Sequence, residues 1–120
     1  MAHLLVVDDN AALVENLVEI LLGAGHTSTI FRHPAEALSC FHEQVYDAAI
    51  LDYRMPELDG VELYKQLKQK DPALRAMIVS AYTNDECLQS ARQQGIQEVL
   101  TKPFDIPVFL ERLSFLLRAA

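Results

Sequence analysis

Short, unbroken runs of apolar residues recur along the chain and alternate with segments of helical periodicity. Residues 4–7, 48–51 and 77–79 contain no polar side chain. A strand without a polar face is covered on both sides, as a parallel strand is when it lies between two layers of helices. These runs therefore predict a parallel sheet with helices on both faces.

Five strands and five helices are expected in strict alternation. The strands are predicted at 3–7, 27–31, 47–51, 75–80 and 98–101, and the helices at 10–24, 34–43, 61–70, 83–94 and 105–118. Because connections between parallel strands are right-handed, this order predicts an α/β doubly wound domain of the (βα)5 type. The expected strand order is 2-1-3-4-5, as in flavodoxin-like folds. With 120 residues, we expect a single domain that spans 1–120.

Polar side chains stand where four of the five predicted strands end. Asp8 and Asp9 follow the first strand, Asp52 the third and Lys102 the fifth, while Ser80 ends the fourth. Ligands of open α/β sheets bind outside the carboxyl ends of the strands, so we expect these five side chains to converge. Each alone has an ordinary explanation as a helix cap or a turn residue. Their joint placement at matching strand ends favours a binding site.

The predicted group of side chains suits phosphoryl chemistry. Three close carboxylates repel one another unless a cation neutralises them, and Mg²⁺ (or Mn²⁺) prefers such oxygen ligands and shares phosphate oxygens. The ammonium of Lys102 can pair with a carboxylate or a phosphoryl oxygen, and the Ser80 hydroxyl can donate a hydrogen bond to it. This set favours acceptance of a phosphoryl group by a carboxylate, with charge stabilisation as the main catalytic contribution.

The acidic composition narrows the classes of partner. Asp and Glu number 17 against 10 Lys and Arg, for a net charge of -7. This balance disfavours nucleic acid binding by the domain itself and favours a divalent cation. No apolar run is long enough to cross a bilayer and the N-terminus lacks a signal-peptide pattern, so we expect a soluble, cytoplasmic protein without a membrane partner. Cys40 and Cys87 match no metal-ligand spacing and are interpreted as small apolar fillers.

Four segments carry a resemblance to a known family over essentially the whole chain. They are Leu5-Val6-Val7-Asp8-Asp9, Asp52-Tyr53-Arg54-Met55-Pro56-Glu57-Leu58-Asp59-Gly60, Ser80-Ala81 and Thr101-Lys102-Pro103-Phe104. In this order and at these separations, they resemble the receiver domains (CheY-like) of two-component response regulators. The resemblance implies a phosphoacceptor signalling domain rather than a classical enzyme, one that promotes its own aspartyl phosphorylation and dephosphorylation. It implies a sensor histidine kinase or a histidine phosphotransfer protein as the phosphoryl donor.

The resemblance also implies a role for each acid. Asp52 would be the phosphoacceptor and would form an acyl phosphate. Asp9 would ligate Mg²⁺ directly, and Asp8 directly or through water. The backbone carbonyl of Arg54 would complete the protein ligands.

Three further residues follow from the same resemblance. Lys102 would pair with Asp52 before phosphorylation and with the phosphoryl group afterwards. Ser80 and the backbone N–H of Ala81 would hold a phosphoryl oxygen, and the Lys102–Pro103 peptide bond would be cis. Movement of the loops after the fourth and fifth strands would then alter the surface of the fourth helix, fifth strand and fifth helix.

Two positions depart from or extend the family pattern. Many receivers carry an aromatic residue three positions before the active-site lysine, but this chain has Val99. A stiff β-branched side chain cannot transmit the signal by ring rotation. Either Tyr82 takes over part of this role, or the signal reaches the output surface through loop and helix movement alone. We favour the second alternative. Arg54 either tunes the lifetime of the phosphoryl group or is an ordinary exposed arginine.

Two apolar helix surfaces predict protein contacts. The fifth helix should bury Phe109, Leu113, Leu116 and Leu117, whereas Val108 and Phe115 lie on another face. That face predicts a homodimer or partner interface formed by the fourth helix, fifth strand and fifth helix, unless Phe115 folds over the edge of the core. The first helix carries a second stripe, composed of Ala11, Val14, Val18 and Leu22. With Phe104 and Ile106 nearby, this stripe would dock against the helical bundle of a kinase.

Three other functions are disfavoured. A degenerate receiver that only binds protein would not need the charged groups that phosphoryl transfer requires, yet all of them are present. A small haloacid-dehalogenase-like phosphatase places a second acid two residues after its nucleophile, where this chain has Arg54. A flavin-binding domain of similar topology would place the flavin phosphate beside the strand-end carboxylates, which would repel it.

Overall fold

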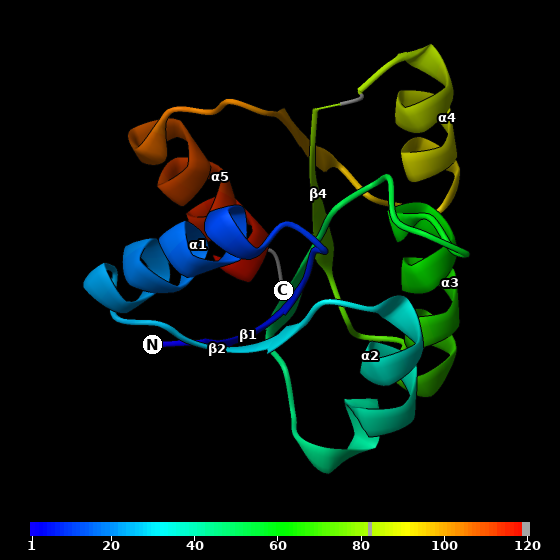
Figure 1. Ribbon diagram of the computed structural model, residues 1–120, viewed down its shortest axis with the longest axis horizontal. Helices are drawn as coiled ribbons and strands as arrows, with labels where there is room; N and C mark the ends of the chain where they lie inside the picture. The colour runs from blue at the N-terminus through cyan, green and yellow to red at the C-terminus, as the bar shows by residue number, and fades with distance from the viewer. Residues whose placement is uncertain (82, 119–120) are drawn as a thin grey trace.

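The computed structural model describes residues 1–81 and 83–118, which form a five-stranded sheet between two layers of helices (Figure 1). The strands are β1 (His3–Val7), β2 (Thr27–Phe31), β3 (Ala48–Leu51), β4 (Ala76–Ser80) and β5 (Glu98–Thr101). The helices are α1 (Ala11–Gly23), α2 (Pro34–Cys40), α3 (Gly60–Lys70), α4 (Asp85–Gln93) and α5 (Ile106–Arg118). A 3₁₀ turn, η1 (Phe41–Glu43), continues α2, so the α-helix ends earlier than predicted.

The sheet has the predicted topology. All four strand pairings are parallel, and the strand order is β2-β1-β3-β4-β5. The chain crosses from β2 over β1 to β3, so the direction of sheet growth reverses between β1 and β3. The carboxyl ends of these two neighbouring strands therefore flank the position where ligands bind in doubly wound folds.

The unbroken apolar runs are explained by two separate cores, because alternate side chains of a strand point to opposite faces. Leu5, Ala49 and Ile78 belong to one core. Leu4 and Ile50 belong to the other, with side chains of α1 and α5. Figure 1 shows α1 and α5 on one face of the sheet and α2, α3 and α4 on the other. Covering both faces holds the central strands rigidly, and with them the residues at their ends.

Side-chain caps start the helices directly after the strand-end loops. The side chain of Asn10 accepts a hydrogen bond from the N–H of Leu13, that of Asp59 from Glu62, and that of Asn84 from Cys87. Such caps satisfy N–H groups that have no partner within the helix. They fix the residues at which α1, α3 and α4 begin.

The apolar helix surfaces agree with the prediction for α5 and differ for α1. Phe109, Leu113 and Leu116 of α5 are buried as expected, and Leu117 is half-buried. In α1 the prediction that Val14 lies on an exposed stripe is wrong, because Val14 is buried. It stands three positions before Leu17 and therefore shares the sheet-facing side of the helix. Within the described residues, no helix has the length and apolarity to span a membrane.

Candidate functional site

Three acidic residues meet at the carboxyl ends of β1 and β3. The N–H of Asp8 donates to the carbonyl of Phe31 at 3.2 Å, and the N–H of Asp52 donates to the carbonyl of Val7 at 3.0 Å. These bonds continue the sheet one residue beyond the strands, so both acids are held by the sheet itself. One carboxylate oxygen each of Asp8, Asp9 and Asp52 lies within 4.8 Å of the others. The predicted convergence of the three acids is confirmed.

Lys102 reaches this acidic group from the loop after β5. Its Nζ lies 2.9 Å from Oδ2 of Asp8 and 3.6 Å from Oδ1 of Asp52. The predicted pairing of Lys102 with Asp52 is therefore present, but the nearer partner is Asp8. The other oxygen of Asp8 accepts the N–H of Asn10 at 2.9 Å. Both oxygens of Asp8 are thus already hydrogen-bonded, a feature that the strand pattern alone did not predict.

The acids differ in exposure, and this difference sets their electrostatics. Asp8 and Asp52 are 3% and 8% exposed, whereas Asp9 is exposed. Burial, followed by the nearby charge of Asp8, raises the pKa of Asp52 to about 6, although Lys102 acts in the opposite direction. Two buried carboxylates with one ammonium between them have an excess of negative charge, which a divalent cation would neutralise. The hard oxygen donors of this group fit Mg²⁺.

Ser80 and Ala81 stand at the same edge of the sheet. Ser80 is the last residue of β4, the strand beside β3, and its side chain is completely buried. Its carbonyl accepts the N–H of Lys102 at 2.9 Å, so the ends of β4 and β5 are linked. Ala81 follows and is exposed. The Lys102–Pro103 peptide bond is cis, as the resemblance implied.

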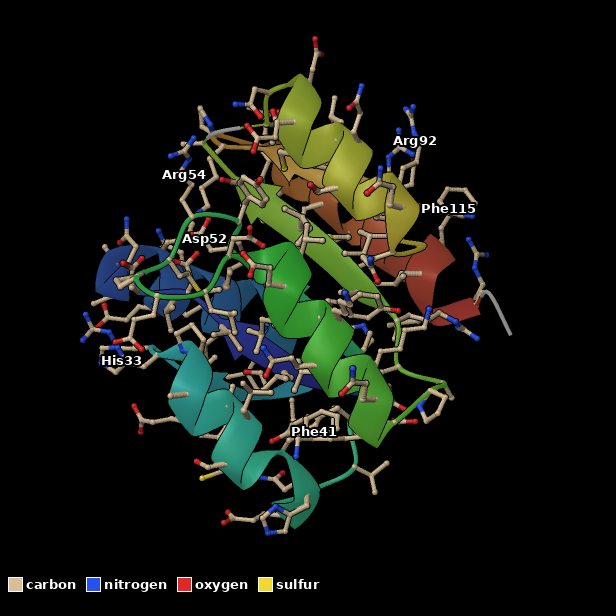
Figure 2. The ribbon with its side chains drawn as sticks, turned by 90° about the vertical axis from the view of Figure 1, so that its right-hand side faces the viewer. His33, Phe41, Asp52, Arg54, Arg92 and Phe115 are labelled. Carbon is tan, nitrogen blue, oxygen red and sulfur yellow. The ribbon has the colours of Figure 1, made fainter. Side chains whose placement is uncertain are left out.

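The loop from β3 to α3 carries Arg54. Figure 2 shows Asp52 and Arg54 at the same end of the sheet. The exposed Arg54 lines a hollow of about 240 Å³ together with Tyr53, Asp59 and Glu86. Arg54 is thus exposed near the end of the sheet that carries Asp52, and its influence on the lifetime of a phosphoryl group stays a prediction. A role of its carbonyl as a metal ligand stays a prediction.

Two residues near the acids escaped the sequence reasoning. Gly60 closes the loop after Asp52, because its N–H donates to the carbonyl of Tyr53 at 2.8 Å. A Cβ at this position would overlap the carbonyl oxygen of Asp52 and would lie 3.0 Å from its carbon. Arg32, at the end of β2, donates from Nη2 to the carbonyl oxygen of Asp9 at 3.1 Å. The Asp59-Gly60 pair before a helix could have indicated the close approach of Gly60 to Asp52. Nothing in the sequence pattern indicated the bond from Arg32 to Asp9.

Val99 is half-buried and packs against the core on the α2–α4 side of the sheet. A valine there is thus part of the packing and has no ring to reorient. Tyr82, the alternative relay residue, lies outside the described residues.

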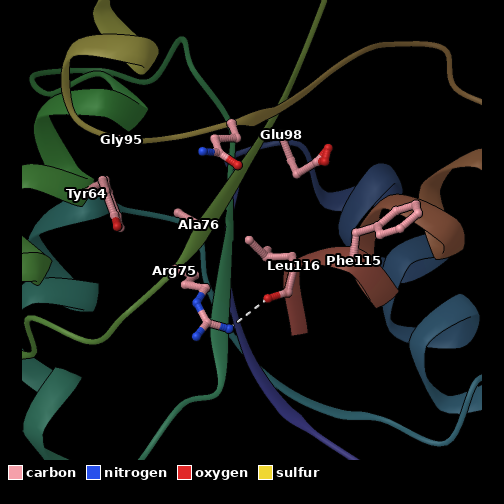
Figure 3. Close-up of a pocket in the computed structure, with 8 residues that line it drawn as sticks. Tyr64, Arg75, Ala76, Gly95, Glu98, Phe115 and Leu116 are labelled. Atoms are coloured by element: carbon pink, nitrogen blue, oxygen red, sulfur yellow. Dashed lines mark hydrogen bonds between the residues drawn. The ribbon is translucent and has the colours of Figure 1, made fainter. Parts of the chain in front are cut away.

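The predicted output face exposes two apolar side chains of α5. Val108 and Phe115 are 41% and 53% exposed, as expected. Phe115 lines a cavity of about 280 Å³ with Tyr64 and Glu98 (Figure 3). Ala76, the first residue of β4, also lines this cavity, so it lies at the strand end opposite Ser80. The cavity is therefore separate from the acidic site, and dimerisation through this face stays a prediction.

Comparisons with known proteins agree with this geometry. Residues 4–114 match the family model of the response regulator receiver domain. A response regulator receiver protein of Anaeromyxobacter sp. (strain Fw109-5) is 39% identical over 111 residues, which are 92% of this chain and 47% of that protein. The DNA-binding transcriptional regulator NtrC of Escherichia coli (strain K12) is 42% identical over 101 residues, which are 84% of this chain and 22% of NtrC.

A solved structure is similar over nearly the whole chain. The chemotaxis protein CheY4 of Vibrio cholerae aligns with a TM-score of 0.90 and 26% identity, covering 98% of this chain and 99% of that one. In contrast, the chain spans less than half the length of each of the two curated relatives described above.

Proposed function

Because this chain belongs to the family of response regulator receiver domains, we propose that Asp52 accepts a phosphoryl group from a sensor histidine kinase or a histidine phosphotransfer protein. We assign this role to a receiver domain spanning 1–120. The observation that carries the proposal is the meeting of Asp8, Asp9, Asp52 and Lys102 at one edge of the sheet. The domain is a signalling element of a two-component system rather than a classical enzyme.

In the proposed transfer, a carboxylate oxygen of Asp52 attacks the phosphorus of a phosphohistidine. An oxygen–phosphorus bond forms, the phosphorus–nitrogen bond breaks, and its electron pair returns to the imidazole. Only the ionised carboxylate is a nucleophile, and with a pKa of about 6 Asp52 is mostly ionised at neutral pH. The ammonium of Lys102, 3.6 Å away, stabilises the charge that builds up on the phosphoryl oxygens.

The carboxylates of Asp9 and Asp52 and the backbone carbonyl of Arg54 would hold Mg²⁺ or Mn²⁺. Both oxygens of Asp8 already accept hydrogen bonds, which favours a contact of Asp8 to the metal through water. A bound divalent ion supplies positive charge beside the phosphoryl oxygens. The structural support for this assignment is the set of oxygen donors within 4.8 Å of one another.

Phosphorylation adds close to two negative charges to this edge. We propose that Ser80 and the N–H of Ala81 bind a phosphoryl oxygen and that Lys102 shifts toward it. Because the Lys102 N–H is bonded to the Ser80 carbonyl, displacement of one loop is transmitted to the other. The surface of α4, β5 and α5 then changes without ring rotation at Val99.

The output and location are part of the same proposal. The face with Val108 and Phe115 would contact a second copy or an effector. Leu22 and Ile106, which are also exposed, would contribute to kinase docking. The domain itself would not bind nucleic acid and would act in the cytoplasm. Any effector activity would belong to further parts of a longer protein, as the length of the relatives suggests.

The test is phosphorylation by a small acyl phosphate in the presence of Mg²⁺, followed by intact-protein mass spectrometry. We expect wild-type protein to gain one phosphoryl group and to lose it after removal of the donor. The Asp52→Asn variant should gain none, whereas Glu19→Gln, which alters an exposed carboxylate of α1, should behave as wild type. A wild-type protein that gains no phosphoryl group would instead favour a degenerate receiver that only binds protein.

A further inference from the structure

We infer that Arg32 is a positioning residue of this site, which holds the backbone of Asp9 so that the Asp9 carboxylate faces the metal. The inference rests on the proposed function and deepens it. Its basis is the 3.1 Å hydrogen bond from Nη2 of Arg32 to the carbonyl oxygen of Asp9. This contact joins the end of β2 to the loop that follows β1.

The sheet brings Arg32 to this position. Val7 and Phe31 are paired in the parallel register of β1 and β2, and the N–H of Asp8 bonds to the carbonyl of Phe31. Arg32 and Asp9 are the next residues on each side. The backbone pairing of β1 and β2 ends at this point, and the guanidinium of Arg32 adds a side-chain bond from one segment to the other just beyond it.

The choice of acceptor is informative. A guanidinium beside three acids would normally pair with a carboxylate, in a charge-assisted bond of the stronger kind. In the part of the chain that the structure describes, Arg32 forms no ion pair with a carboxylate. It binds the main chain of Asp9 instead, which leaves the Asp9 carboxylate among the three oxygens that lie within 4.8 Å of one another.

Asp9 needs such an anchor more than its neighbours do. Asp8 is buried and held through both carboxylate oxygens, by Lys102 and by the N–H of Asn10. Asp52 is buried at the end of a central strand. Asp9 is exposed, so packing does not fix it, and its direction depends on the backbone of a loop of three residues. Removing the Arg32 contact therefore loosens one metal ligand and leaves the other acids in place.

The positive charge of Arg32 opposes metal binding, whereas its hydrogen bond to Asp9 favours it. A guanidinium near the site repels a divalent cation, so its removal would by itself strengthen metal binding. Because Arg32 is exposed, however, this repulsion is screened at physiological ionic strength, with a Debye length of about 8 Å. A hydrogen bond at contact distance is screened much less. We therefore expect the anchoring effect to exceed the repulsion.

The experiment is a calorimetric titration of the whole protein with Mg²⁺ alone at physiological ionic strength, for wild type, Arg32→Ala, Arg32→Lys and Arg92→Ala. Arg92 is exposed in the last turn of α4, so Arg92→Ala changes the net charge equally without touching the site. We expect Arg32→Ala to weaken Mg²⁺ binding about three- to tenfold, as loss of one hydrogen bond allows. Arg32→Lys, which keeps a charged donor, should recover part of the affinity. Because this hydrogen bond is exposed, its loss should lower thermal stability without Mg²⁺ only slightly, so all four proteins stay folded during the titration.

Tighter or unchanged Mg²⁺ binding by Arg32→Ala would overturn the inference, and so would an equal loss in Arg92→Ala. A drop in thermal stability that accounts for the weaker binding would reduce Arg32 to a purely structural role. Phosphorylation of wild type by the acyl phosphate is measured in parallel. If wild type neither binds Mg²⁺ nor becomes phosphorylated, the proposed function fails together with the inference. If wild type does both and Arg32→Ala binds Mg²⁺ equally well, the inference alone fails.

Discussion

One ammonium group, that of Lys102, lies 2.9 Å from Asp8 and 3.6 Å from Asp52, so a single cation serves two buried carboxylates. The bond to Asp8 is the shorter one, and Lys102 is therefore held in place without full neutralisation of Asp52. A lysine so placed can approach a phosphoryl group on Asp52 by a small movement. Burial of Asp52, followed by the nearby charge of Asp8, keeps the pKa of Asp52 raised despite this cation.

Replacement of Lys102 by Met should slow phosphorylation of Asp52 strongly. The ammonium lowers the pKa of Asp52, so its loss raises that pKa further above about 6 and removes a charge that stabilises the transferring group. We expect a loss of about 100-fold in rate with a small acyl phosphate at pH 7. The rate is measured by intact mass over a range of pH, with Lys70→Met at the end of α3 as the control. An unchanged rate and an unchanged pH midpoint would contradict this role of Lys102.

Replacement of Asp52 by Asn should stabilise the metal-free protein at neutral pH. The folded-state pKa of Asp52 is raised from 3.8 to about 6, so ionisation of Asp52 destabilises the fold. This penalty is absent below 3.8, develops as the pH rises toward about 6, and stays constant above it. The shift corresponds to a gain for Asp52→Asn of up to about 3 kcal/mol at pH 7.

The measurement is urea unfolding in the presence of a chelator at pH 7 and again at about pH 4, where the difference from wild type should nearly vanish. Glu19→Gln removes an exposed carboxylate and should change stability little at either pH. An Asp52→Asn variant that is less stable than wild type at pH 7 would show that Asp52 contributes favourable contacts larger than its burial cost.

The strands and helices were predictable because burial on both faces leaves a direct pattern in the sequence. The blocks at 4–7, 48–51 and 77–79 have no polar side, and the structure places them in the three central strands. The strand-end acids were predictable for a related reason, since parallel strands bring their carboxyl ends to one edge. Helix ends were less certain because the last turn of α2 is 3₁₀, a difference that depends on a few backbone angles.

The details of the site depend on side-chain and loop conformations that no periodicity encodes. The preference of Lys102 for Asp8 depends on which rotamer the long lysine adopts. The bond from Arg32 to the Asp9 carbonyl depends on where the pairing of β1 and β2 ends. The burial of Val14 depends on the rotation of α1 by a fraction of a turn. These features follow from packing between elements and not from the pattern within any one of them.

Replacement of Gly60 by Ala should both destabilise the protein and impair Asp52, the proposed phosphoacceptor. The added methyl group would collide with the backbone carbonyl of Asp52 and would lie 3.2 Å from a side-chain carbon of Ile78. Backbone is less able to yield than a flexible side chain, so we expect a loss of about 2 to 4 kcal/mol in the free energy of unfolding. Phosphorylation by the acyl phosphate should slow as Asp52 is displaced.

Gly23→Ala is the matched control, because no atom beyond its chain neighbours and the backbone of its own helix lies within 4 Å of the position of its Cβ at the end of α1. Denaturant unfolding and the phosphorylation rate are measured for both variants. A Gly60→Ala protein with wild-type stability would mean that the loop after Asp52 relaxes freely, and the site would then be less rigid than the sheet supporting it.

Replacement of Arg54 by Ala should shorten the lifetime of phosphorylated Asp52. The side chain of Arg54 is exposed two residues after Asp52 and at the same end of the sheet (Figure 2), so we expect it to obstruct the approach of water to a phosphoryl group on Asp52. We expect dephosphorylation to accelerate about three- to tenfold once the side chain is truncated. Arg54→Met keeps most of the bulk and removes the charge, so it should retain the slow rate if obstruction is the cause. Release of phosphate after removal of the donor measures all three rates. Equal rates for wild type and Arg54→Ala would leave Arg54 as an ordinary surface arginine, and a fast Arg54→Met would assign the effect to its charge.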